Sequence, residues 1–103
     1  GGPSADIQGI KVRALTPELL QHLKIEGDVQ GVVVTDVDPG SPAAEAGLQP
    51  GDVITRIAQQ DVASVSQFRD LMNQHAKPGA SVLIRTISRG GDAITRVLKV
   101  PQE

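Results

Sequence analysis

The stretch GSPAAEAGLQPGDVI, residues 40–54, decides the fold, because it holds the signals for a short helix, a turn and a strand. Ser41 can cap a helix that starts at Pro42, and alanines give this helix a small surface. Gly47 fits the position after the helix end, where a left-handed backbone costs glycine nothing. The turn at residues 49–51 then leads into an apolar strand. These residues predict a helix packed closely against a sheet.

Outward from this unit, apolar periodicity predicts the remaining elements. Thr16-Pro17 and Ser64 carry helix start signals, the latter with a glutamine three residues on. The predicted strands cover residues 7–15, 31–37, 52–57, 61–63, 81–88 and 93–100. The predicted helices cover residues 17–23 and 42–46, together with a longest helix that begins at 65 and ends at the Lys77-Pro78-Gly79 sequence. The last two strands form a hairpin around a turn at residues 89–92.

The composition is that of one globular domain with an aliphatic core. The chain has 103 residues, 39% hydrophobic and 21% charged, and Phe68 is its only aromatic residue. Its net charge of −2 and scattered basic residues argue against nucleic acid as a partner. No apolar run approaches the roughly 20 residues that a membrane-spanning helix needs. The chain contains no cysteine, so it has neither disulfides nor thiol chemistry.

The sequence lacks the patterns that support catalysis. It has no nucleophile elbow of the G-x-S-x-G type and no glycine pattern that cradles phosphate. His22 and His75 are isolated in different predicted helices, which favours surface or helix-end positions over a general base or a metal site. We therefore expect no catalytic residue, metal or cofactor in this chain alone.

The run from GVVV at residue 31 through GSPAAEAGL to GDVI at residue 54 closely resembles the signature of PDZ domains. This resemblance implies an α+β, mostly β fold. It would be a partly open antiparallel barrel or sandwich of five to six strands, with two main helices and one short alanine-rich helix. It covers essentially residues 7–100. We therefore expect the domain to span residues 6–101, with residues 1–5 as a cloning scar or linker and residues 102–103 as a tail.

The order of elements is similar to that of the circularly permuted, bacterial type of PDZ domain. Together with the LTPE sequence at residues 15–18, it resembles the HtrA/Deg (DegP/DegQ-like) family of trypsin-like serine proteases, and their second PDZ domain more than their first. The resemblance implies a periplasmic serine endopeptidase as the parent protein, with a role in protein quality control and the stress response.

In this family a peptide C-terminus adds as a strand between the first strand and the long helix, and loop amides hold its carboxylate. The loop maps onto residues 7–10, the pairing strand continues from it, and one face of the long helix completes the pocket. By this resemblance the predicted peptide-binding residues are Ile7, Gln8, Gly9, Ile10, Lys11, Val12, Phe68, Leu71 and Met72.

The apolar members of this set are also compatible with a structural role. Ile10 and Val12 alternate as core residues of a strand would. A helix packed on a sheet must bury a stripe, so one of Leu71 and Met72 belongs to the core. Phe68, as the only aromatic residue, is also suited to anchor the interior.

Three positions near the loop bear on the ligand assignment in different ways. Gly9 would let the backbone approach a carboxylate, but it also fits a simple turn or bulge. Gln8 stands where the family prefers an apolar residue. Asp6 places a negative charge beside a site meant for a carboxylate, and no basic residue precedes it.

Two functions therefore remain open. The first is a peptide-binding module that captures C-termini or unfolded segments for an attached protease domain. The second is a distal domain that contacts the protease domain or neighbouring subunits and controls oligomeric assembly, with a weak or unused groove.

Overall fold

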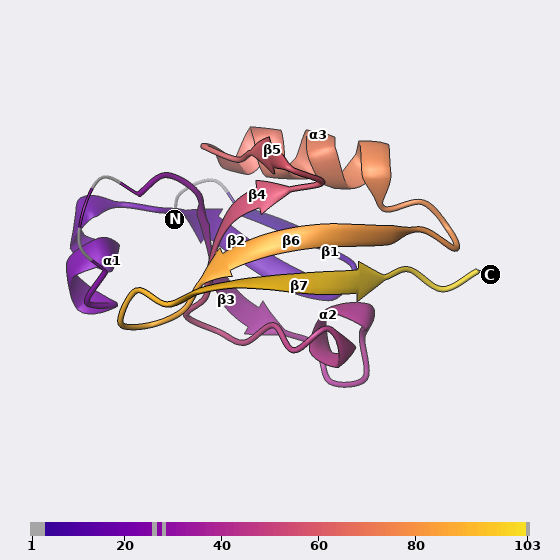
Figure 1. Ribbon diagram of the computed structural model, residues 1–103, viewed down its shortest axis with the longest axis horizontal. Coiled ribbons are helices and arrows are strands. Elements are labelled where there is room, and N and C mark those ends of the chain that lie inside the picture. Colours follow the sequence, from indigo (N-terminus) through magenta and orange to yellow (C-terminus); the bar gives the residue numbers. More distant parts are fainter. Residues whose placement is uncertain (1–3, 26, 28, 103) are drawn as a thin grey trace.

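The computed structural model describes residues 4–25, 27 and 29–102, with no side-chain description for residues 4 and 5. Figure 1 shows its strands crossing the molecule between three helices. In chain order the elements are β1 (Ser4–Ile7), β2 (Ile10–Ala14), α1 (Pro17–His22), β3 (Val32–Val37), α2 (Pro42–Glu45), β4 (Val53–Ile57), β5 (Gln60–Asp61), α3 (Val65–His75), β6 (Ser81–Ile87) and β7 (Ala93–Lys99). The mostly β class, the two main helices and the short alanine-rich helix are confirmed.

The helices start where the sequence predicts. The hydroxyl oxygens of Thr16, Ser41 and Ser64 each accept a hydrogen bond from the backbone N–H three residues on, at 3.1–3.2 Å. At α3 the Gln67 side chain also accepts from the N–H of Ala63 at 2.7 Å. Each cap satisfies a donor that the first helical turn leaves unpaired, so these short helices have defined beginnings.

All strand pairs are antiparallel, and the sheet order is β1-β2-β3-β4-β6-β7, with β5 paired to β4. Helix α3 packs against β1, β2 and β4, while α2 packs against β7. Figure 1 shows these two helices on opposite sides of the strands. The sheet thus curls around one interior.

Two apolar clusters stabilise the fold. The main cluster fills the interior and includes Ile10, Phe68 and Met72, none of which is exposed. The second lies on the side of the sheet away from the interior, where Val33 and Val53 are covered by residues of α1 and the segment that follows it. This second cluster covers only one end of that side of the sheet.

The β3–α2–β4 unit is held by close backbone contacts. Val34 donates its N–H to the Asp52 carbonyl and accepts from the Gly51 N–H, both at 2.8 Å. A β-carbon on Gly31 would collide with the carbonyl oxygen of Ile54, so only glycine fits there. The small residues of the opening stretch thus permit the close packing that the sequence predicts.

The N-terminal strand differs from the prediction. Instead of one strand over residues 7–15, the chain forms β1, a two-residue turn and β2, so the sheet has seven strands where five to six are expected from the sequence. The reason is the turn itself, since Gln8 and Gly9 both have positive φ, +56° and +84°, as a tight hairpin turn requires. Ser4 and Ala5, which we assigned to a linker, therefore lie in a strand, while residues 1–3 and 103 lie outside the described residues.

Candidate functional site

The structure brings the predicted apolar residues of β2 and α3 together. All belong to the main cluster, and Ile7 packs against it from the end of β1. The exposed fractions are 0% for Ile10, Phe68 and Met72, 1% for Val12 and 8% for Leu71. These side chains form a continuous apolar floor, with the half-buried Ile7 as its outermost member.

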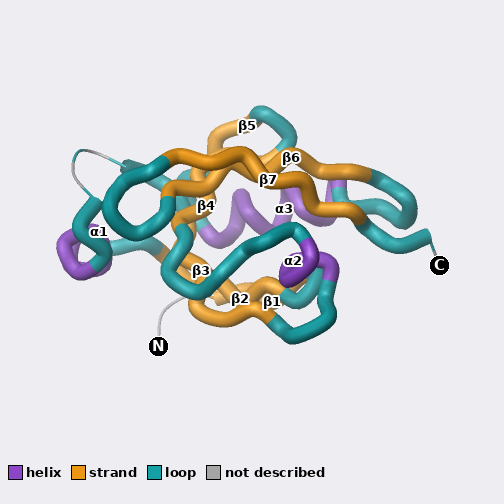
Figure 2. Tube along the Cα trace, turned by 60° about the horizontal axis from the view of Figure 1, so that its bottom comes forward, coloured by secondary structure: helices purple, strands orange, loops and turns teal. Residues whose placement is uncertain are grey.

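The predicted loop is the turn between β1 and β2, and it is tied to the start of α2. The Gly9 carbonyl accepts a hydrogen bond from the N–H of Asp38 at 2.9 Å. The Ser41 hydroxyl donates to the Asp38 carbonyl at 2.7 Å, and a β-carbon on Gly9 would collide with the Ser41 side chain. Figure 2 shows α2 beside this turn. Gly9 is thus a turn glycine, and its role toward a carboxylate stays a prediction.

The edge of β2 that faces α3 is paired with the chain's own β1. The register places Ile7 opposite Ile10, Ala5 opposite Val12 and Ser4 opposite Arg13. Helix α3 packs against β1 as well as β2. The strand position between β2 and α3, where the resemblance implies a peptide, is therefore filled by residues 4–7.

One pair of opposite charges lies across the exposed side of this hairpin. Asp6 lies directly opposite Lys11, and both side chains are exposed. Opposite charges across an antiparallel pair are stabilising, by roughly 0.2–1 kcal/mol. Lys11 thus places a positive charge directly opposite Asp6, beside the loop.

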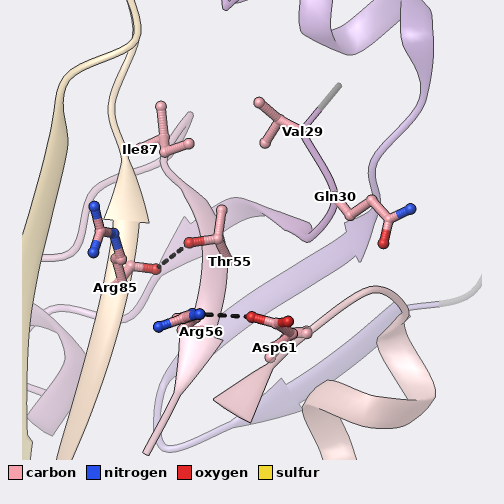
Figure 3. Close-up of a pocket in the computed structure, with 8 residues that line it drawn as sticks. Val29, Gln30, Thr55, Arg56, Asp61, Arg85 and Ile87 are labelled. Carbon is pink, nitrogen blue, oxygen red and sulfur yellow. Dashed lines mark hydrogen bonds and ion pairs between the residues drawn. The ribbon is translucent and has the colours of Figure 1, made fainter. Parts of the chain in front are cut away.

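A separate cavity of about 550 Å³ opens on the side of the sheet away from the main cluster (Figure 3). It lies where β4 stops pairing with β3 and begins to pair with β5, beside the segment that precedes β3. Arg56 Nε and Asp61 Oδ1 form an ion pair at 2.9 Å, and Thr55 Oγ1 donates to the Arg85 carbonyl at 3.3 Å. The lining residues are Val29, Gln30, Thr55, Arg56, Asp61, Val62, Arg85 and Ile87.

A second hollow of about 420 Å³ adjoins the first, because Arg56 and Arg85 line both. The two arginines are cross-strand neighbours, and next to them Leu83 lies opposite Val97. Leu83 and Val97 are 40% and 42% exposed. We call this surface, Arg56, Leu83, Arg85, Thr95 and Val97, the outer face. Sequence reasoning missed it, although the alternation in β6 already places Leu83 and Arg85 on the side opposite the core.

Asp52, in the GD pair of the signature, is buried rather than available for chemistry. Its carboxylate accepts a hydrogen bond from the Gln49 N–H at 3.2 Å and closes the turn before β4. Burial raises its pKa above the ordinary value of 3.8, against the lowering effects of that hydrogen bond and of Arg96. Arg96 reaches over Gly47, whose added β-carbon would lie 2.6 Å from the guanidinium.

The histidines lie apart. His22 is exposed at the end of α1, and the Nε2 atom of His75 lies 3.3 Å from the Gln60 side-chain nitrogen. Within the described part of the chain, no three potential metal ligands lie close enough to hold a metal ion.

Residues 33–86, more than half of the chain, match the sequence profile of the PDZ domain family. The chain belongs to this family. It is 36% identical over 91 residues to the probable periplasmic serine endoprotease DegP-like of Chlamydia trachomatis, covering 88% of this chain and 18% of that protein. It is 38% identical over 98 residues to the protein of the same name from Hahella chejuensis, covering 95% and 20%. This PDZ domain thus spans about a fifth of these relatives.

Solved structures support the same assignment. The HtrA-type protease AlgW with decapeptide is 34% identical, with a TM-score of 0.74 over 97% of this chain and 30% of that one. The HtrA3 PDZ domain bound to a phage-derived ligand is 23% identical and shares the fold, with a TM-score of 0.72 over 96% of this chain and 88% of that one. No helix in the described residues is long and apolar enough to cross a membrane.

Proposed function

We propose that this chain is the peptide-binding module of an HtrA/Deg-type serine endoprotease of the bacterial periplasm. An extended segment with an apolar end adds to the edge of β2 and places its last side chain on the apolar floor between β2 and α3. The binding recruits substrates to the attached protease domain or regulates that domain. Catalysis belongs to the protease domain.

The observation that carries this proposal is the way β1 lies on β2. It supports the proposal, because this edge is paired with an antiparallel strand whose last residue, Ile7, packs on the floor. Further support comes from the AlgW relative, which was solved with a decapeptide. Because main-chain hydrogen bonds carry such binding, many sequences are accepted. A short flexible ligand loses entropy on ordering, so we expect roughly micromolar affinity, about 8 kcal/mol.

A titration with paired peptides tests the proposal. Peptides that end in an apolar residue are added to the whole chain as free acids and as C-terminal amides, while amide chemical shifts are recorded. We expect the acids to bind and to shift the signals of residues 7–12 and of α3. Equal binding of the amides would contradict capture of the C-terminus. Shifts confined to the outer face would contradict the location.

A second candidate function is an assembly contact, which the outer face favours. In the described part of the chain the Arg85 side chain has no hydrogen-bond or ion-pair partner, and it lies beside the exposed Leu83 and Val97. Like charges directly opposite one another, as Arg56 and Arg85 are, destabilise a sheet unless an anion lies near them. Among the described residues, Asp61 forms an ion pair with Arg56 and with no second cation. The partner that fits is an acidic and apolar surface elsewhere in the same protease assembly.

Charge reversal in the full-length parent protein tests this candidate. Arg85→Glu should lower the assembly size seen by sedimentation, whereas Arg89→Glu, in the exposed β6–β7 turn, should leave it unchanged. An unaltered assembly in Arg85→Glu would exclude the outer face as the contact.

A further inference from the structure

We propose that β1 is a built-in competitor for the peptide site and that its sequence displays the class of peptide the site accepts. This inference rests on the proposed function, and it adds both a regulation and a ligand preference to it. The accepted class is a C-terminal segment that ends in an acidic residue followed by an apolar residue of about the size of isoleucine.

The direction of β1 supports the competition. It runs antiparallel to β2 and ends beside the first residue of β2, at the loop. A peptide that brings its C-terminus to that loop and pairs antiparallel with β2 must run the same way. Both strands would use the same backbone groups of β2, and both would lie under α3. Peptide and β1 therefore exclude each other.

The Ile7 position indicates the terminal residue. Ile7 lies opposite Ile10, contacts the main cluster and is half-buried. A free peptide would present its last side chain to the same floor. Residues that pack there gain from apolar burial, about 25 cal/mol per Å² of surface removed from water. An apolar last residue is therefore preferred.

The Asp6 position indicates the residue before it. Because side chains alternate along a strand, Asp6 points away from the floor and lies opposite the exposed Lys11. Arg13, two residues further along β2, lies opposite Ser4 and is also exposed. The solvent side of the peptide site is thus lined by two cations. It favours acidic residues at the penultimate position and two residues before that.

The tether gives β1 a large advantage over a free peptide. A two-residue turn joins it to β2, so its effective concentration at the site exceeds that of a dilute ligand. The apparent affinity of an external peptide equals its intrinsic affinity multiplied by the fraction of molecules in which β1 is displaced, so it is low while β1 stays paired. Releasing β1 therefore switches the site on without changing the floor.

A reversible cross-link tests the competition, because the chain has no cysteine of its own. Ser4→Cys with Arg13→Cys places two thiols at directly opposite positions of the hairpin. Ser4 and Arg13 form a non-hydrogen-bonded pair, in which the strands lie close. The probe is a fluorescein-labelled peptide that ends in Ser-Ala-Asp-Ile with a free carboxylate. We expect at least about tenfold weaker binding in the disulfide form than in the reduced form of the same protein. Equal binding by both forms would overturn the competition.

Two proline variants test release without a cross-link. In a two-residue hairpin the pairs alternate, so Ala5 donates to β2 and Ser4 does not. Ala5→Pro removes that bond and should tighten probe binding about fivefold, whereas Ser4→Pro should behave like the unmodified chain. Hydrogen exchange without peptide gives an independent readout. The Val12 amide should be protected in the unmodified chain and lose protection in Ala5→Pro. A Val12 amide unprotected in the unmodified chain would overturn the placement of β1.

A charge swap tests the ligand preference. The probe ending in Ser-Ala-Lys-Ile should bind about threefold more weakly than the acidic probe, and Lys11→Glu should reverse that order. Lys24→Glu, outside the site, is the control. An unchanged order in Lys11→Glu would overturn the preference. If no probe binds any form while Val12 is protected, the proposed function fails and the hairpin stands. If all forms bind alike, the function stands and the competition fails.

Discussion

The β3–α2–β4 unit and the β1–β2 hairpin are both built around glycines, but the two regions tolerate change very differently. In the first, Gly31 lies against the backbone of β4, and hydrogen bonds at 2.8 Å join Val34 to both Gly51 and Asp52. In the second, β1 is paired on one side only, at the end of the sheet, and contributes the half-buried Ile7 to the core. One region is enclosed by backbone and the other lies on an open edge.

The difference separates the residues that identify the family from those that carry the proposed binding. The match to the PDZ family begins at residue 33, after the hairpin. Close backbone packing leaves few acceptable residues, so the unit is recognisable in sequence. An edge strand can leave its place while the core stays intact, and such displacement is what the proposed binding requires.

The largest effect should come from Gly31→Ala. The new β-carbon would collide with a β4 carbonyl that cannot move without breaking the sheet, so we expect a loss of about 3 kcal/mol in unfolding free energy. Gly40→Ala is the matched control, because Gly40 has a positive φ but no atom near an added β-carbon. It should lose only about 1 kcal/mol. Urea denaturation measures both, and similar losses would remove the contrast.

Gly9→Ala should cost about 2 kcal/mol, from its positive φ and the collision with the Ser41 side chain. In a Ser41→Gly background the collision is absent, and glycine still serves as a helix cap. The same Gly9→Ala change should then cost about 1 kcal/mol. A double-mutant cycle by urea denaturation gives the coupling between these residues. A coupling near zero would show that the hairpin turn does not depend on α2.

The β4–β5 turn offers a gain in stability of smaller size. Ala58 and Gln59 have φ values of +51° and +68°, in a turn of the kind that the first hairpin makes with Gly9. Gln59→Gly should raise the unfolding free energy by about 1 kcal/mol, because glycine takes this conformation without strain. Gln60→Gly, in β5, should instead lower it. Thermal unfolding of the two variants distinguishes them, and a destabilised Gln59→Gly would contradict the strain.

The smallest effect should be the pH dependence of Asp52. Burial raises its pKa in the folded state, so the native protein holds this proton more tightly than the unfolded chain. The contribution of Asp52 to stability therefore falls as pH rises above 3.8 and is constant once the folded carboxyl is ionised. The Asp52→Asn variant has no carboxyl at this position, so its stability does not fall for this reason. Its stability relative to the unmodified chain should rise with pH across that window and then level off. A flat difference in unfolding free energy would contradict the shift.

Much of the fold was predictable because its signals are local. Ser41 and Pro42 start α2, the alternation in residues 81–87 specifies a strand, and each acts within a few positions. The additional strand β1 was missed because Gln8 is an unusual first residue for a hairpin turn. The alternation of apolar residues therefore predicted a single continuous strand from residue 7 to residue 15. Which partner an edge strand pairs with depends on the whole sheet, and local periodicity does not contain that information.

The sequence predicted which residues form the site, but not that β1 covers them. The family pattern placed the apolar residues of β2 and α3 on one surface, and Ile10 and Phe68 do meet in the main cluster. That surface is covered by β1, which no spacing in the sequence indicates. The outer face was missed for another reason. Arg56 and Arg85 are separated by 29 positions and become neighbours only through the β4–β6 register.

The placement of β1 has a mechanical consequence. Tension applied at its first residue, Ser4, loads the β1–β2 pair at the end opposite the turn, so the bonds open one after another instead of sharing the load. Peeling of this kind needs little force. A pull transmitted through the backbone ahead of residue 4 would uncover the edge of β2 while α3, β3 and β4 kept their positions.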